Sequence, residues 1–153
     1  MVHPFHKILS PVDFSDENSL AALEYAAYVA RQCDATVYLL YVIPADEAQL
    51  PRELYHRDKS GGADLAWAKK TVEEKLREIA QERLGGEIPY EILTRIGGDA
   101  ATAVLEAAEA LEAGLIVLAT QGRTGLSRFL QGSVTEQVVR DSLCPVLAIR
   151  VSA

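Results

Sequence analysis

The stretch that decides the fold is Thr36–Ile43, which reads TVYLLYVI and consists almost entirely of β-branched, aromatic and aliphatic residues. An uninterrupted apolar run of this length predicts a strand that is covered on both faces, as in a parallel sheet. Upstream, Lys7–Pro11 (KILSP) gives a second strand signal, and apolar residues at helical spacing occupy the segment between the two. The chain therefore opens with a strand, a helix and a strand.

The same alternation continues downstream. A polar, irregular stretch over residues 45–62 predicts a long loop, and a helix is expected from Leu65 to the glycine pair at 85–86. Further strands, separated by helices, are expected at residues 88–96, 115–119 and 146–151. This order requires crossover connections, which give a doubly wound, five-stranded parallel sheet with helices on both faces. Because neither a repeat nor a linker interrupts it, residues 1–153 are interpreted as a single α/β domain.

The composition excludes several classes of partner and location. The formal net charge is −7, and an acidic surface repels the phosphate backbone of nucleic acids. A nucleic-acid partner is therefore not expected. No apolar run is long enough to cross a bilayer, so a membrane is not expected either. Cys33 and Cys144 lie far apart and form no CxxC pair, which favours two reduced thiols in a cytoplasmic protein. The three histidines show no metal-ligand spacing, and no metal site is expected.

Two loops that follow strands are candidates for a ligand site, because ligands of doubly wound sheets bind beyond the carboxyl ends of strands. The first reads ATQGRTGLSRFLQGSVT over residues 119–135. Its three glycines allow the backbone to approach a ligand closely. Ser133 and Glu136 form the S-x-x-E capping pattern, which predicts that a helix begins at Ser133 and presents free N–H groups to a phosphate.

The charge of this stretch supports a phosphate site. It contains Arg123 and Arg128, and no acidic residue occurs between positions 113 and 135. A locally positive strip in an acidic protein is what a small anion requires. The stretch matches neither a Walker A loop nor a dinucleotide-binding glycine motif, so a flexible loop followed by an ordinary capped helix is the alternative.

The second loop is Pro11-Val12-Asp13, at the end of the first strand. Asp13 can accept a hydrogen bond from a ligand amine. The alternative is that Asp13 joins local turn and capping bonds. The residues by themselves leave both interpretations open.

Four blocks carry a family resemblance: KILSPVDFS at residues 7–15, TVYLLYVIP at residues 36–44, IGGDAATAVLEAAEALEAGLIVLATQG at residues 96–122, and GRTGLSRFLQGSVTEQVVRDSLCPVLAIR at residues 122–150. Through them the chain resembles the universal stress protein family over essentially its whole length. The ATP-binding branch of that family carries a glycine, two residues, a second glycine, nine residues, and then Gly-Ser or Gly-Thr. Here Gly122 and Gly132-Ser133 match this motif, whereas Ala119 stands in place of the first glycine.

The resemblance implies a fold, an assembly and a set of ligand contacts. The fold is the adenine nucleotide alpha hydrolase-like sheet with strand order 3-2-1-4-5, and the fifth strand joins two copies into a homodimer. The adenine base would lie against the loop Pro11-Val12-Asp13 and against Val42. The ribose and phosphates would follow Ala119, Thr120, Gln121, Gly122, Arg123, Thr124 and Gly125, and the phosphate contacts would be completed by Gly132, Ser133, Val134 and Thr135.

The expected function is ATP binding, with Mg²⁺ tolerated, by a regulatory protein of the stress response rather than by an enzyme. An enzyme needs a base or a metal-binding carboxylate near the γ-phosphate, and the motif loop supplies none. Two alternatives are a slow ATP hydrolase or phosphotransferase and an interaction protein of the same family whose loop has lost ATP. Ala119 favours the interaction protein, because its methyl group crowds a ribose. The sequence identifies neither a protein partner nor the inducing stress.

Overall fold

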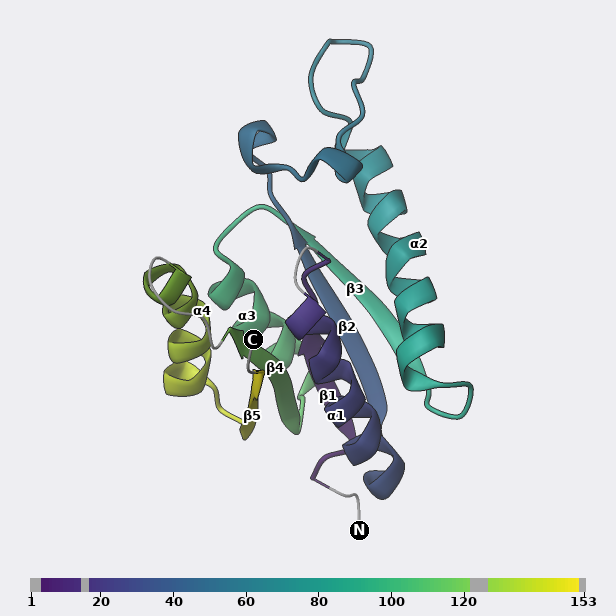
Figure 1. Ribbon diagram of the computed structural model, residues 1–153, viewed down its shortest axis with the longest axis vertical. Helices are drawn as coiled ribbons and strands as arrows, with labels where there is room; N and C mark the ends of the chain where they lie inside the picture. Colours follow the sequence, from purple (N-terminus) through teal and green to yellow (C-terminus); the bar gives the residue numbers. More distant parts are fainter. Residues whose placement is uncertain (1–3, 15–16, 122–126, 152–153) are drawn as a thin grey trace.

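The computed structural model describes residues 4–14, 17–121 and 127–151. Strands and helices alternate along these residues in the predicted order. The elements are β1 (Lys7–Pro11), α1 (Glu17–Cys33), β2 (Thr36–Ile43), α2 (Leu65–Leu84), β3 (Tyr90–Ile96), α3 (Ala100–Leu111), β4 (Leu115–Gln121), α4 (Ser127–Asp141) and β5 (Val146–Val151). All five strands are parallel and lie in the order β3-β2-β1-β4-β5, which confirms the expected sheet (Figure 1).

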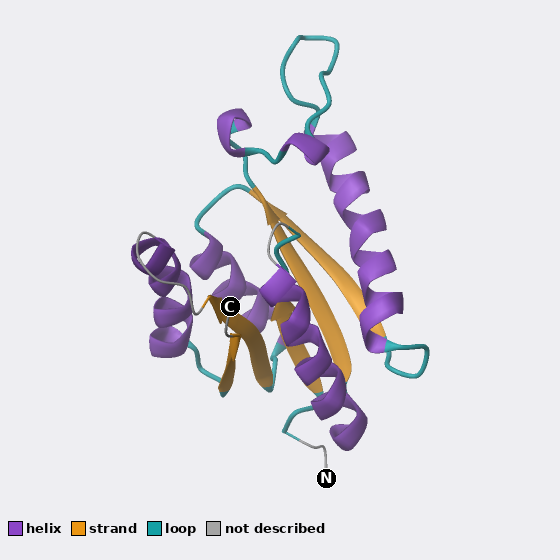
Figure 2. Cartoon of the chain, in the orientation of Figure 1, coloured by secondary structure: helices purple, strands orange, loops and turns teal. Residues whose placement is uncertain are grey.

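Two layers of helix cover the sheet, with α1 and α2 on one face and α3 and α4 on the other (Figure 2). The side chains of β2 show how the layers form, because successive side chains of a strand point to opposite faces. The odd-numbered residues from Val37 to Ile43 pack with α1 and α2 in what we call the first cluster. Tyr38 and Leu40 pack with α3 and α4 in the second cluster. The run Thr36–Ile43 is therefore covered on both faces, as predicted.

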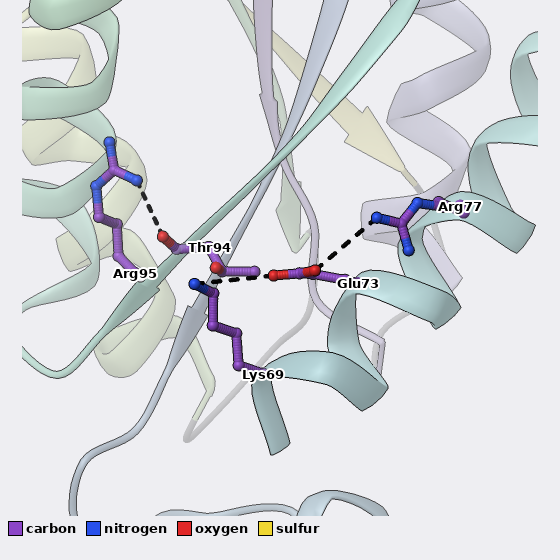
Figure 3. Close-up of polar contacts among 5 residues, drawn as sticks. All are labelled: Lys69, Glu73, Arg77, Thr94 and Arg95. Carbon is purple, nitrogen blue, oxygen red and sulfur yellow. Dashed lines mark hydrogen bonds and ion pairs between the residues drawn. The ribbon is translucent and has the colours of Figure 1, made fainter. Parts of the chain in front are cut away.

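The solvent face of α2 carries alternating charges. Glu73 forms ion pairs with Lys69 at 3.9 Å and with Arg77 at 3.8 Å, and in the edge strand β3 the Arg95 guanidinium donates to the Thr94 carbonyl oxygen at 2.9 Å (Figure 3). Exposed pairs at helical spacing contribute about 0.3–0.5 kcal/mol each, so the buried side of α2 holds it on the sheet. Neither this 20-residue helix nor any other described helix is long and apolar enough to cross a membrane.

The segment between β2 and α2, expected to be a long irregular loop, contains two short 3₁₀ helices, η1 (Glu47–Gln49) and η2 (Arg52–Leu54). Figure 1 shows this segment standing above the ends of β2 and β3. Leu50 and Leu54 are buried in the first cluster, and Leu54 has no exposed surface. The middle of the loop is therefore anchored in the core.

Several boundaries differ from the expected ones. β3 begins at Tyr90 rather than at residue 88, because Pro89 has no N–H to donate to the ladder. α3 ends at Leu111, because Glu112 adopts a left-handed conformation with φ 56°. α4 begins at Ser127 rather than at Ser133. A single glycine inside a helix costs only about 1 kcal/mol, so Gly132 does not prevent the helix from starting earlier.

Candidate functional site

The strand order of the sheet reverses at β1, which lies between β2 and β4. β1 pairs with β2 over its whole length, Lys7–Pro11, but with β4 it pairs only at Ile8 and Leu9. Beyond them the buried Ser10 hydroxyl donates to the Val117 carbonyl oxygen at 3.0 Å, so a side-chain hydrogen bond takes the place of the backbone ladder. The two strands therefore separate before their carboxyl ends, and the loops that follow them lie on the edge of the sheet where ligands usually bind in such folds.

The loop after β1 is held on two sides. The Val12 N–H donates to the Leu40 carbonyl oxygen of β2 at 2.8 Å. The Asp13 N–H donates to the hydroxyl oxygen of Ser19, a residue of α1 that is 8% exposed, at 2.8 Å. The backbone N–H of Asp13 thus takes part in a local hydrogen bond, as one interpretation of the sequence expects. Taken over all its atoms, Asp13 is exposed to solvent. Ser15, the next residue after Phe14, lies outside the described residues.

Phe14, next to Asp13, meets two residues that sequence reasoning did not single out. The rings of Phe14 and Tyr41 stack with centroids 4.6 Å apart and an angle of 15° between the ring planes. The Lys75 ammonium of α2 lies 5.6 Å from the centroid of the Phe14 ring, within the range of a cation–π interaction. Burial, together with the negative charges of Asp13 and Glu53, raises the pKa of Tyr41 to about 12. We call Phe14, Tyr41 and Lys75 the Phe14 cluster.

The structure places β1 next to β4 in the sheet, as the sheet order predicts. Pro11 is partly buried at the end of β1, and Ala119 is partly buried against the first cluster. The Thr120 hydroxyl lies 3.5 Å from the Ile149 carbonyl oxygen of β5, and Gln121 is the last residue of β4. Val42 packs on the second cluster, on the face of the sheet opposite to Tyr41.

The expected start of the phosphate-binding helix is wrong. Because α4 begins at Ser127, Gly132 and Ser133 lie inside the helix and not at its start. N–H groups in a helix interior bond to carbonyl oxygens four residues earlier, so unpaired N–H groups belong to the first turn from Ser127. Val134 and Thr135 are partly buried, and Val134 packs on the second cluster. The remaining predicted contacts, Gly122, Arg123, Thr124 and Gly125, lie outside the described residues.

A cavity of about 390 Å³ lies away from these residues, between α3 and the connection from α4 to β5. Its lining residues precede β4 and β5, which places it at the amino ends of these strands. The lining includes Glu109, Glu112 and Asp141 and no basic residue, so it repels phosphate. An anionic ligand is therefore not expected in this cavity. Within the described part of the chain, no three His, Cys, Asp or Glu side chains group together to hold a metal ion.

Comparison with known proteins gives the family. The model of the Universal stress protein family matches residues 4–150. This chain belongs to the universal stress protein family. Universal stress protein MJ0531 of Methanocaldococcus jannaschii is 36% identical over 157 residues, which cover 95% of this chain and 82% of the relative. Universal stress protein MJ0577 of the same organism is 30% identical over 161 residues, which cover 95% of each.

Solved structures of universal stress proteins share the fold of this family member. The structure of hypothetical protein MJ0577 has a TM-score of 0.65 at 25% identity and covers 98% of this chain and 99% of that chain. A universal stress protein in complex with cAMP has a TM-score of 0.68 at 20% identity, with 97% and 98% covered. The universal stress protein of Archaeoglobus fulgidus in complex with dAMP has a TM-score of 0.59 at 23% identity, with 97% and 99% covered.

Proposed function

We propose that this universal stress protein binds ATP at the carboxyl edge of β1 and β4 and acts in the cytoplasm as a regulator rather than as an enzyme. The observation that carries the proposal is that β1 stops pairing with β4 after Leu9, on the strand that leads into Asp13. Proteins of the same fold have been solved with cAMP and with dAMP, which supports an adenine nucleotide as the ligand. Cys33 and Cys144 are free thiols, in keeping with a reducing compartment.

Each end of the nucleotide has its own recognition chemistry in this proposal. The Asp13 carboxylate accepts a hydrogen bond from the adenine amino group, with Pro11, Val12 and Val42 around the base. The phosphates, with or without Mg²⁺, follow the connection from β4 to α4, where Arg123 and Arg128 supply positive charge. The first turn of α4 adds unpaired N–H groups and a partial positive charge. Phosphate contacts from Gly132, Ser133, Val134 and Thr135 stay a prediction of the family resemblance.

Titration calorimetry with ATP is expected to show saturable binding, and Asp13→Ala is expected to weaken it about 10- to 100-fold. The reason is that a hydrogen bond to a charged acceptor contributes about 1.5–3 kcal/mol, and about 1.4 kcal/mol corresponds to a factor of ten. Glu109→Ala is the matched control, because it removes the same charge at the opposite edge of the sheet. This control should bind ATP as the parent does.

The same samples separate the alternative functions. If the parent gives neither heat nor a thermal shift at millimolar ATP, the interaction protein is the correct alternative. If chromatography of the incubated mixture shows ADP formed at about 1 s⁻¹, the low end of common enzyme rates, the hydrolase is correct. A regulator leaves ATP intact, as expected from a motif loop without a carboxylate.

We also propose that β5 joins two copies into a homodimer. β5 is an edge strand, and its Leu147 is 36% exposed; apolar edge strands favour pairing with another chain. Light scattering at micromolar concentration should give a dimer mass for the parent and a monomer mass for Leu147→Lys. Ile96→Lys is the control, because Ile96 is 46% exposed on β3, the opposite edge strand. A monomer mass for the parent, or for both variants, contradicts the proposal.

A further inference from the structure

Three separate parts of the chain meet at the Phe14 ring. Phe14 belongs to the loop after β1, Tyr41 to β2 and Lys75 to α2. The Phe14 and Tyr41 centroids are 4.6 Å apart, and the Lys75 ammonium is 5.6 Å from the Phe14 centroid. Stacked rings and cation–π contacts each stabilise such an arrangement. The ring of this loop residue is therefore held by a regular strand and a regular helix.

Asp13 lies between two anchors as a result. Its own N–H donates to the Ser19 hydroxyl oxygen at 2.8 Å, and the ring of the next residue, Phe14, rests on Tyr41. An aspartate side chain has two rotatable bonds, so fixing the backbone on both sides limits the positions that its carboxylate can reach. Ordering a polar group before the ligand arrives reduces the entropy that binding must overcome.

We infer that Phe14 is a positioning residue, whose contacts with Tyr41 and Lys75 hold the Asp13 carboxylate where it distinguishes an amino group from a carbonyl group on a purine. This inference rests on the proposed function and assigns base specificity to residues that need not touch the base. An ionised carboxylate only accepts hydrogen bonds. It therefore attracts the 6-amino group of adenine and repels the 6-oxo group of hypoxanthine.

The protonation state of Tyr41 suits this role. Its hydroxyl is neutral at physiological pH, and burial together with the charges of Asp13 and Glu53 raises its pKa from 10.0 to about 12, so it stays neutral in mildly alkaline solution as well. The stack consequently holds Phe14 without placing a third anion beside the two carboxylates. The Lys75 ammonium places a positive charge over the Phe14 ring.

The test compares ATP with ITP, which differ at one group of the purine, by calorimetry at one pH and salt concentration. The parent should prefer ATP by about tenfold or more, as expected for one hydrogen bond to a charged group. Phe14→Leu keeps an apolar side chain but removes the stack. We expect it to weaken ATP binding about fivefold, to leave ITP binding unchanged and so to reduce the preference to about twofold. A role in folding alone would weaken both nucleotides equally.

Two further variants separate the parts of the cluster. Tyr41→Phe keeps both rings and should keep the preference of the parent for ATP. Lys75→Met removes the cation but keeps an unbranched side chain, and it should reduce the preference about twofold. Because Lys75 is partly exposed, this variant tests the inference even if Phe14→Leu does not fold.

The outcomes separate the inference from the proposed function. A parent that does not bind ATP overturns the proposed function and this inference with it. A parent that binds ATP and ITP equally leaves nucleotide binding intact and overturns the base-reading role of Asp13 and Phe14. A parent that prefers ATP, while Phe14→Leu and Lys75→Met keep the same preference, overturns the positioning role alone.

Discussion

Replacing Leu54 with alanine is expected to lower the free energy of unfolding by about 2–5 kcal/mol, the usual range for a leucine removed from a core. Leu54 belongs to η2, in the connection between β2 and α2, yet it has no exposed surface and packs in the first cluster. Removing its side chain leaves a cavity beneath the loop. Urea denaturation followed by circular dichroism measures the change. An ordinary loop residue would change stability by less than about 0.5 kcal/mol.

Leu143→Ala is the matched control for this experiment, because it makes the same chemical change at a residue that is 90% exposed. It should leave the unfolding free energy within about 0.5 kcal/mol of the parent. Equal stabilities of the Leu54 and Leu143 variants would show that the core does not anchor the loop.

Raising the pH from 9 to 11.5 is expected to destabilise the parent by about 2 kcal/mol more than the Tyr41→Phe variant. Folding raises the pKa of Tyr41 from 10.0 to about 12, first through burial and then through the charges of Asp13 and Glu53. The folded state therefore retains a proton that the unfolded state loses above pH 10. This stabilisation is complete below pH 10 and is lost as the pH rises through 12.

The measurement is urea unfolding of both proteins at pH 9 and at pH 11.5. Other tyrosines and the lysines titrate in the same range, and the comparison with Tyr41→Phe cancels their contribution. At pH 9 the parent and the variant differ only by the loss of the hydroxyl. Parallel losses of stability in the two proteins would mean that Tyr41 titrates as it does in the unfolded chain.

The fold was largely predictable because the signals in the sequence are local. Lys7–Pro11, Thr36–Ile43 and the final strand have clear apolar patterns, and proline lies at or beside an end of each. The start of α4 was not predictable in this way. A capping pattern at Ser133 favours a helix start, but it does not prevent the helix from beginning at Ser127. The anchors of the long loop were missed because a 3₁₀ helix of three residues is too short to show periodicity.

The candidate site was predictable only in part. Asp13 was found because it follows a strand, and the strand order then brings its loop beside the end of β4. The Phe14 cluster was not found, because its members belong to three elements far apart in the sequence. That Tyr41 faces α2 depends on which helix covers which face of the sheet. No local sequence pattern predicts which helix covers which face. The alternation of Tyr41 with Val42 shows only that the two side chains point to opposite faces of the sheet.

The short pairing between β1 and β4 has a consequence for cooperativity. The β1–β4 ladder spans only Ile8 and Leu9, with one further backbone hydrogen bond from the Gly114 N–H to the Lys7 carbonyl oxygen, but both hydrophobic clusters run across this seam. Val37 and Val117 share the first cluster, and Leu40 and Leu118 share the second. Neither half can separate without exposing apolar surface on both of its faces, so the halves unfold together.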